Sequence, residues 1–318
     1  MTFSKTDTEA LAALFQAARR DPPGRFILDQ TIDGPLFSLT GETSDPSVFL
    51  ALAPRNRDQS ARPLSAVGLV RLLAWDSQFF GFPCARLEQL LAAGDNARRR
   101  AGADEVLDQV MAWCREQGVR FIVGKVAGPD PAMVQALESH GFYLTDTQVA
   151  LSRRDQPIPD SIPPRGFSFA DETADPRETA RAFHRLFYDG RFHHDPRLDV
   201  EKADQLWEEA IFSQLQGRSR DMILLAEDGR PVGLSVVQSG GEASNGTRAG
   251  CLFIFGLREE YRGQGLGRIL LRETLRRITG KYRRLDLETS TFNLPALKLY
   301  MSHGFKWERI KLSLHAWL

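Results

Sequence analysis

The stretch Tyr261-Arg262-Gly263-Gln264-Gly265-Leu266-Gly267 decides how the rest of this 318-residue chain is interpreted. It lies between an apolar run, 251–257, that predicts a buried strand and a segment, 265–278, with helical spacing. Its three glycines let the backbone pass close to a ligand and adopt positive φ. Amides in front of a helix N-terminus form a cradle for an anion, and a pyrophosphate is the natural occupant. The alternative is a glycine turn that only lets strand and helix pack.

Two better-known phosphate motifs do not fit this loop. No Gly-Lys-Ser/Thr follows it, so it is not a P-loop. Its glycines also miss the GxGxxG spacing, which disfavours a dinucleotide-binding fingerprint.

The surrounding residues, 167–318, predict a complete α/β unit. Asp175-Pro176-Arg177-Glu178 is a helix start, and Asp228-Gly229 predicts a hairpin. The segment 239–247 is expected to be a flexible loop. Strands are expected at 167–170, 222–226, 232–238, 251–257, 285–288 and 310–317, and helices after 175 and at 207–215, 265–278 and 295–303.

Residues 66–152 predict a smaller α/β unit. Strands are expected at 67–75, 119–126 and 142–152, and helices at 103–117 and 132–140. Four prolines within 153–166 indicate an extended linker. Residues 1–65 are an N-terminal extension of unknown role, with an amphipathic helix expected at 8–20 and apolar runs at 26–28 and 48–50.

A weak internal repeat relates the two units. Ser139-His140-Gly141-Phe142 recurs as Ser302-His303-Gly304-Phe305, an offset of 163 (302 − 139) that also pairs Arg99 with Arg262 and Gly102 with Gly265. The shared order of helix, strand, helix and strand favours duplication over chance. The period is far longer than that of solenoid repeats.

At this point the chain resembles a known family. Arg-x-x-Gly-x-Gly at 262–267, after a strand, is similar to the acetyl-CoA signature of the GNAT N-acyltransferases. Asn293-Leu294-Pro295-Ala296-x-x-x-Tyr300-x-x-x-Gly304-Phe305 resembles their second conserved segment. The resemblance implies an α/β (α+β) tandem GNAT fold with a central mixed sheet. Residues 66–152 would be a partial, degenerate unit and 167–318 the catalytic domain.

The resemblance also implies an acetyl-CoA site. No metal is expected, because no second ligand set accompanies His193 and His194 with convincing spacing. The CoA pyrophosphate would bind the amides of 263–268, and the thioester carbonyl would meet a backbone amide near Leu257. Tyr300 would protonate the leaving thiolate, or else it is only a core tyrosine. Asn293 would cap its helix and contact CoA, or only cap. The expected cofactor-binding residues are Leu257, Arg262, Gly263, Gln264, Gly265, Leu266, Gly267, Arg268 and Asn293.

A narrower resemblance concerns the acceptor. Trp75-Asp76-Ser77-x-Phe79-Phe80-Gly81 and Gly190-Arg191-Phe192-His193-x-Asp195-Pro196 look like segments of TDP-fucosamine (TDP-4-amino-4,6-dideoxygalactose) acetyltransferases. Those enzymes acetylate the 4-amino group of a TDP-4-amino-4,6-dideoxyhexose. This chain departs from them by about 65 further N-terminal residues.

Several residues could serve that acceptor. A base for the amine could be His193, Glu288 or a water relay. Arg191 and Arg197 could bind acceptor phosphates, or be solvated surface charges. The remaining candidates are His194, which with His193 would otherwise be an exposed loop pair, and Trp75 and Asp76, which would otherwise pack a domain interface.

The first unit is not expected to catalyse. Asp104 stands where the repeat predicts Gly267, and a carboxylate there would oppose a pyrophosphate. Leu137 stands where the repeat has Tyr300.

Composition narrows the remaining classes of function. Lys plus Arg and Asp plus Glu both total 41, so the net charge is zero, which argues against nucleic acid and anionic membrane as partners. The three cysteines lie too far apart for a disulfide framework or a thiolate zinc site. A cytoplasmic protein with no membrane span is expected, and a homodimer through 310–317 is plausible. Alternatives are a GNAT enzyme for another small amine, amino acid or protein N-terminus, and a non-catalytic acyl-CoA-binding regulator.

Overall fold

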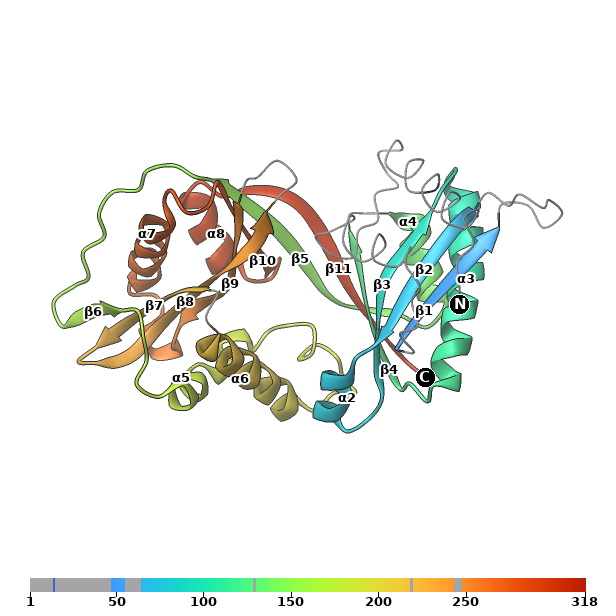
Figure 1. Ribbon diagram of the computed structural model, residues 1–318, viewed down its shortest axis with the longest axis horizontal. Coiled ribbons are helices and arrows are strands. Elements are labelled where there is room, and N and C mark those ends of the chain that lie inside the picture. Colours follow the sequence, from blue (N-terminus) through green and yellow to red (C-terminus); the bar gives the residue numbers. More distant parts are fainter. Residues whose placement is uncertain (1–13, 15–46, 55–63, 128–129, 218–219, 243–247) are drawn as a thin grey trace. The chain divides into compact units, whose positions relative to one another are not determined.

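A computed structural model describes residues 14, 47–54, 64–127, 130–217, 220–242 and 248–318 (Figure 1). The chain divides into two compact units. Unit 1 consists of Met1–Thr147 together with Ile310–Leu318, and unit 2 of Gln148–Arg309. This division differs from the predicted boundaries, because residues 148–152 fall in unit 2 and the end of the chain falls in unit 1.

Unit 1 is a mixed sheet covered by two helices. Its strands run in the order β1-β2-β3-β4-β11, all antiparallel neighbours except the parallel pair β3–β4. In chain order its elements are β1 (Val48–Pro54), β2 (Leu64–Leu72), α2 (Ala74–Phe80), β3 (Cys84–Ala92), α3 (Asn96–Glu116), β4 (Phe121–Ala127) and α4 (Pro131–Ser139), followed by the first part of β5 (Tyr143–Arg154) and the last part of β11 (Lys306–Trp317).

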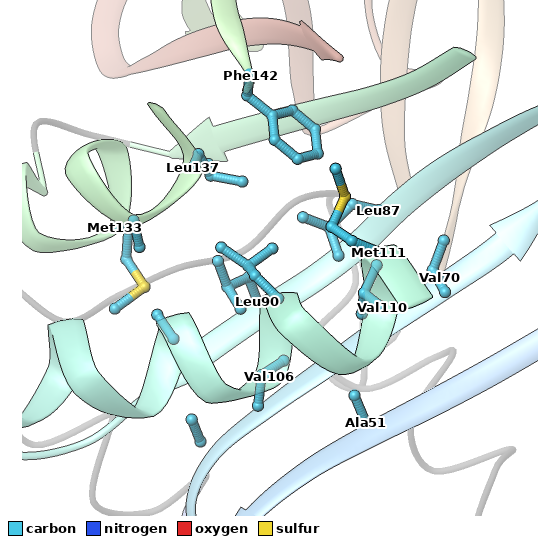
Figure 2. Packing of buried hydrophobic residues seen from close by; sticks show 14 of the residues in the cluster. Ala51, Val70, Leu87, Leu90, Val106, Val110, Met111, Met133, Leu137 and Phe142 are labelled. Carbon is cyan, nitrogen blue, oxygen red and sulfur yellow. The ribbon is translucent and has the colours of Figure 1, made fainter. Parts of the chain in front are cut away.

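The core of unit 1 lies between the sheet and helices α3 and α4. Figure 2 shows Leu90 of β3 beside Val106 of α3, with Met133 and Leu137 of α4 nearby. The four side chains are at most 1 % exposed. The 3.6-residue spacing of the apolar positions on α3 is what turns them toward the sheet.

Three expectations for unit 1 were wrong. The strand expected at 67–75 ends at Leu72, and Trp75 lies in the first turn of a short helix, α2, in which Ser77 Oγ donates to Leu73 O (2.6 Å). The strand β3 was not predicted. The helix expected from 103 begins seven residues earlier, at Asn96, because its first turns are polar and carry no apolar period.

The extension 1–65 contributes to unit 1. Strand β1, which includes the apolar run 48–50, pairs antiparallel with β2 from Val48↔Arg71 onward. The helix expected at 8–20, apart from Leu14, and the run 26–28 lie outside the described residues.

Unit 2 is a second mixed sheet with helices on both faces. Strands run in the order β5-β10-β9-β8-β7-β6, with β9–β10 the parallel pair. Helices α7 and α8 cover one face, and α5 and α6 cover the other (Figure 1). Its further elements are β6 (Phe167–Ala170), α5 (Pro176–Ala182), the short 3-10 helix η2 (His184–Phe187), α6 (Val200–Gln216), β7 (Arg220–Glu227), β8 (Arg230–Glu242), β9 (Arg248–Leu257), the 3-10 helix η3 (Glu259–Tyr261), α7 (Leu266–Ile278), β10 (Arg284–Ser290) and α8 (Leu294–Ser302).

The helix start and the hairpin turn that the sequence predicted in unit 2 are confirmed. Asp175 caps α5 by accepting from the amides of Arg177 and Glu178. Asp228 and Gly229 adopt φ of +47° and +79° in the turn between β7 and β8, as a tight hairpin requires. The loop expected at 239–247 was wrong in part, because β8 continues to Glu242; residues 243–247 lie outside the described part of the chain.

Strand pairing supports the duplication. In unit 1, β4 pairs with β11 so that Phe121 faces Trp317; in unit 2, β10 pairs with β5 so that Arg284 faces Arg154. Both partners are shifted by the offset of the repeat, 163 residues (284 − 121 and 317 − 154). Each copy of the repeat is therefore completed by the last strand of the other copy, β11 beside β4 and β5 beside β10.

The repeated tetrapeptide has the same conformation in both units. His140 and His303 each bond through Nδ1 to the carbonyl four residues earlier, at 2.7 and 2.8 Å. Gly141 and Gly304 follow with φ of +82° and +85°. The helix ends at the same point in each copy because only glycine takes this φ without strain.

Candidate functional site

An opening between β9 and β10 is the central feature of unit 2. These parallel strands pair only from Ala249↔Arg284 to Cys251↔Asp286. Beyond that point β9 stays with β8 and β10 with β5. A bulge at Phe253, between the pairs formed by Leu252 and Ile254, bends β9 at the start of the opening. Beyond this point, the backbone N–H and C=O groups that β9 and β10 turn toward each other pair with no described strand.

The glycine loop lies where β9 ends, and its backbone is uncovered. Gly263 and Gly265 have φ of +76° and +80°, which non-glycine residues rarely adopt. A Cβ built on either would meet nothing within 4 Å. Gly265 is the N-cap of α7 and supplies no side chain to the first amides of the helix. An uncovered run of amides in front of a helix N-terminus is suited to an anion, and the predicted contact with the CoA pyrophosphate stays a prediction.

Three side-chain contacts hold the loop in place. The Tyr261 hydroxyl donates to Glu227 Oε2 (2.7 Å) at the end of β7, and this hydrogen bond raises the pKa of Tyr261. Arg262 Nε donates to Leu257 O (3.2 Å). The Arg262 guanidinium also lies 5.4 Å from the ring of Tyr188. The loop is therefore fixed both to the end of β9 and to the β7–β8 hairpin.

Tyr300 lies on α8, on the same face of the sheet as α7. Its ring is 6 % exposed and makes edge contacts with Phe255 (5.8 Å) and Phe305 (5.6 Å). The hydroxyl makes no hydrogen bond to another described residue. Burial raises the pKa of Tyr300, so the phenol is protonated at neutral pH. Tyr300 is therefore a core tyrosine whose hydroxyl has no hydrogen-bond partner among the described residues, and its role as a proton donor stays a prediction.

Asn293 caps α8, as expected. Its Oδ1 accepts from the amide of Ala296 (3.2 Å). Its predicted contact with CoA stays a prediction.

Glu288 lies on the face of β10 opposite to Tyr300. Its neighbours Leu285 and Leu287 join the apolar cluster that contains Tyr300, so the alternating strand turns Glu288 the other way. That other face is the one covered by α5 and α6. Glu288 is only partly buried.

The connection between η2 and α6 lies close to both the glycine loop and the start of α8. A Cβ on Gly256 would lie 2.3 Å from Leu186, so η2 packs directly against the end of β9. The ring of Tyr188 contacts Arg262, and the ring of His194 lies 6.1 Å from Phe292, just before α8. Residues 188–194 thus extend from the glycine loop to the start of α8.

His193 is buried in this connection. Its side chain is 6 % exposed, and Nε2 bonds Asp204 Oδ1 on α6 (3.1 Å). The other nitrogen, Nδ1, is buried without a hydrogen bond. Sequence reasoning missed Asp204, which stands eleven residues from its partner in an ordinary acidic helix face.

The other predicted acceptor residues of unit 2 have simpler surroundings. Arg191 stacks on its neighbour Phe192 (4.5 Å) and is partly buried. Arg197 is exposed, and its amide donates to Asp195 Oδ1 (3.0 Å). His194 is hydrogen-bonded to Asp189.

Trp75 and Asp76 belong to unit 1. Both lie on α2, where the Trp75 ring is 49 % exposed and stacks on Phe79 (5.4 Å). The glycine loop and Tyr300 belong to unit 2.

Unit 1 carries different interactions and residues at the positions that match Arg262, Gly267 and Asn293 of unit 2. Arg99 and Asp130, 163 residues before Arg262 and Asn293, form a buried ion pair (2.8 Å). Asp104, in the place of Gly267, bonds Arg100 inside α3. Only three residues separate β3 from α3, so there is no glycine loop.

The described residues contain no group of three or more His, Cys, Asp or Glu side chains placed to hold a metal ion. None of their helices combines the length and apolarity that a bilayer crossing needs. Residues 311–317, within the strand suggested for dimerisation, pair with β4.

Comparison with known proteins finds a family model that matches most of unit 2. Residues 173–305 match the model of the acetyltransferase (GNAT) family. A search of curated proteins finds no match.

Solved structures share the fold over nearly the whole chain. A GCN5-related N-acetyltransferase from Sphaerobacter thermophilus is 17 % identical, with a TM-score of 0.60 over 97 % of this chain and 91 % of its own. A tandem GNAT protein from the clavulanic acid biosynthesis pathway is 17 % identical, with a TM-score of 0.57 over 98 % and 96 %. A GCN5-related glucosamine N-acetyltransferase region of a fungal GH3 β-N-acetylglucosaminidase is 14 % identical, with a TM-score of 0.58 over 92 % and 38 %.

These findings confirm the tandem GNAT fold and the assignment to the acyltransferases, enzymes whose family uses acetyl-CoA. Residues 173–305, which hold the glycine loop, the strand opening and Tyr300, therefore match the model of the GNAT family of acetyltransferases.

Proposed function

We propose that the protein is an acetyl-CoA-dependent N-acetyltransferase that acts on the amino group of a nucleotide-linked amino-dideoxy sugar. The observation that carries the acetyl-transfer part is the opening between β9 and β10, flanked by the uncovered amides of 263–267 and by Tyr300. A thioester arm that enters this opening passes from the phosphate loop to Tyr300 along one face of the sheet.

On the side of the acetyl donor, the proposed groups are backbone amides and the Tyr300 hydroxyl. The amides of 263–268 hold the pyrophosphate, and an amide near Leu257 polarises the thioester carbonyl as negative charge develops on its oxygen. The acceptor nitrogen attacks that carbonyl carbon, the carbon–sulfur bond breaks, and Tyr300 donates its proton to the departing sulfur. The raised pKa of Tyr300 supports this role, because the proton is present at neutral pH.

The acceptor side needs a group that takes a proton from the amine. Glu288 is the preferred base, because it lies on β10 where the strands have parted and faces away from Tyr300. His193, the second candidate, is held by Asp204 and buried, which supports a role in fixing the 188–194 segment. A water relay is the third route.

The proposed acceptor is the nucleotide-linked amino sugar that the sequence resemblance suggests. Arg191 and Arg197 would bind its phosphates, and His194 would line its site. A fold neighbour described as a glucosamine N-acetyltransferase region supports an amino sugar as the acceptor. Another small amine, an amino acid or a protein N-terminus is the alternative, with the same chemistry.

The test is release of the CoA thiol from acetyl-CoA. A TDP-4-amino-4,6-dideoxyhexose would be compared with glucosamine, polyamines, amino acids and N-terminal peptides. Selective release with the sugar nucleotide is the expected result. Release only with another amine would overturn the acceptor and leave acetyl transfer standing. No release across the panel, with acetyl-CoA bound, would favour a CoA-binding regulator.

A further inference from the structure

Three exposed cations near the glycine loop form no ion pair with any other described residue. They are Arg268 and Arg272 on α7 and Lys298 on α8, here called the α7–α8 cation cluster. The next arginine on the same stripe of α7 behaves differently. Arg276 bonds both carboxylate oxygens of Glu273, at 2.7 and 2.8 Å.

The cluster begins one residue after the glycine loop. Arg268 and Arg272 are one helical turn apart, so their side chains are neighbours, and two like charges so placed disfavour a free helix. A Cβ on Gly267 would lie 3.6 Å from Leu299, the residue after Lys298, so α8 packs against this part of α7. After the larger effect of burial, both arginines lower the pKa of His303 at the end of α8.

The internal repeat provides a comparison within one chain. The residues 163 positions before the three cations are Glu105, Gln109 and Gln135 (268 − 105, 272 − 109 and 298 − 135). None of these is a cation. Unit 1 also carries Asp104 in place of Gly267 and has no glycine loop. The uncompensated cations therefore accompany the loop that fits an anion, and they are absent where that loop is absent.

We infer that the α7–α8 cation cluster binds the 3′-phosphate of CoA, a phosphate separate from the pyrophosphate held by the loop. This assignment rests on the proposed use of acetyl-CoA. The 3′-phosphate is a phosphomonoester that carries nearly two negative charges at neutral pH. Neutral loop amides are suited to the pyrophosphate, whereas guanidinium groups pair bidentately with a phosphomonoester. One ribose joins the two phosphate groups, which matches a cluster that starts immediately after the loop.

The experiment compares acetyl-CoA with 3′-dephospho-acetyl-CoA by calorimetric titration of the full chain. The unaltered protein should bind acetyl-CoA about 10-fold or more tightly, since two charge-assisted contacts are at stake. In the Arg268→Gln/Arg272→Gln variant, this preference should fall to about 2-fold or less, through weaker acetyl-CoA binding alone. Lys298→Gln should cause a smaller loss. The preference should also weaken as salt is raised, because these side chains are exposed.

Arg276→Gln is the matched control. It removes the same charge from the same stripe of α7, one turn beyond Arg272, and its expected effect on either donor is less than 2-fold, about the scatter of such measurements. Arg277 remains to pair with Glu273 (2.6 Å).

Each outcome decides the assignment. Equal binding of the two donors by the unaltered protein overturns it while leaving the proposed function intact. Equal loss of both donors in the double variant also overturns it, because the arginines would then support the loop rather than the 3′-phosphate. Failure of the unaltered protein to bind either donor overturns the proposed function together with this inference.

Discussion

Tyr300 is the residue on which the proposed chemistry depends most. Replacing it with Phe keeps the ring that contacts Phe255 and Phe305, and it removes only the hydroxyl that has no partner among the described residues. Turnover should fall about 100-fold or more if this hydroxyl is the acid. Acetyl-CoA affinity, from calorimetry, should change little.

Tyr282→Phe is the control for that substitution. Tyr282 donates to Asp221 Oδ2 (3.2 Å), beyond the far end of α7. Unchanged turnover in Tyr300→Phe would remove Tyr300 from the mechanism.

The protonation of Tyr300 gives a prediction for pH. Burial raises its pKa above the ordinary value of 10, so the acid form persists through pH 10. Its ionisation should therefore cause no loss of turnover between about pH 8 and 10. The same burial favours the neutral phenol in the folded state, so its contribution to stability is present below pH 10 and lost only as pH rises toward the folded-state pKa. A pH profile of turnover, alongside one for Tyr300→Phe, measures this; a basic limb seen only in the unaltered protein would contradict it.

The choice of base can be settled by two amide substitutions. Glu288→Gln should reduce turnover about 100-fold with little change in acetyl-CoA affinity, because a positioned base contributes about that much. His193→Gln should act mainly on stability, since it disturbs the bond to Asp204 (3.1 Å). The reverse ranking of the two variants in turnover would move the role of base to His193.

At the scale of elements, the glycine loop and α7 act together. Gly265 has a φ of +80°, so Gly265→Ala places a Cβ in left-handed backbone at a cost of about 1–2 kcal/mol. The strain should distort the amides that receive the pyrophosphate, and acetyl-CoA affinity should fall about 10-fold. Calorimetry measures the affinity and thermal unfolding the stability.

A glycine just beyond the other end of α7 controls for strain alone. Gly280 has a φ of +78°, and a Cβ there would also meet nothing within 4 Å. Gly280→Ala should lower stability similarly and leave acetyl-CoA affinity unchanged. Equal effects of the two variants on affinity would mean that the loop amides do not hold the donor.

Arg99 and Asp130 stand in unit 1 where unit 2 has Arg262 of the glycine loop and Asn293, and they form a buried ion pair. Arg99→Met leaves the Asp130 carboxylate buried without its partner, which should lower the free energy of unfolding by about 3–5 kcal/mol. Asp130→Asn in the same chain should recover much of the loss, since Asn can still cap α4 as Asp130 does. Urea unfolding of the two variants measures both values. A loss that persists in the double variant would show that packing, rather than unpaired charge, is responsible.

Elements that carry their own signal could be predicted from the sequence. The glycine loop, the cap at Asp175 and the turn at Asp228-Gly229 each depend on a few adjacent residues. The polar first turns of α3 gave no apolar period, so its start was missed. The opening between β9 and β10 could not be read from either strand alone, because it depends on which strand each one pairs with.

At the scale of the whole molecule, the sequence again indicated what lies in its own pattern and missed what depends on a distant partner. The offset of 163 residues indicated a duplication, and the registers of β4–β11 and β10–β5 repeat it. The exchange of final strands between the units left no mark in the sequence, because both strands have ordinary strand patterns. Asp204 and Glu227 were missed for a related reason: each acts through a partner at least eleven residues away.

The exchange predicts how a shortened chain behaves. A chain that stops at Arg309 lacks the strand beside β4, which buries Leu314 and Ala316 in unit 1. Its unit 1 amides should lose protection from hydrogen exchange, while those of unit 2 should keep most of theirs. Trp307→Ala, in the exposed part of β11, is the control that leaves both units protected. Full protection of unit 1 in the shortened chain would contradict the prediction.

The position of β11 also bears on synthesis of the chain at the ribosome. Unit 1 is translated first, yet the strand beside β4 comes from residues 311–317. Domains generally fold as units during translation, the N-terminal one first. Here the first unit has to wait with an open sheet edge until residues 311–317 have been translated. A ribosome that stalls before this segment would leave that edge exposed to other nascent chains, so this protein should depend on ribosome-associated chaperones more than two independently closed domains would.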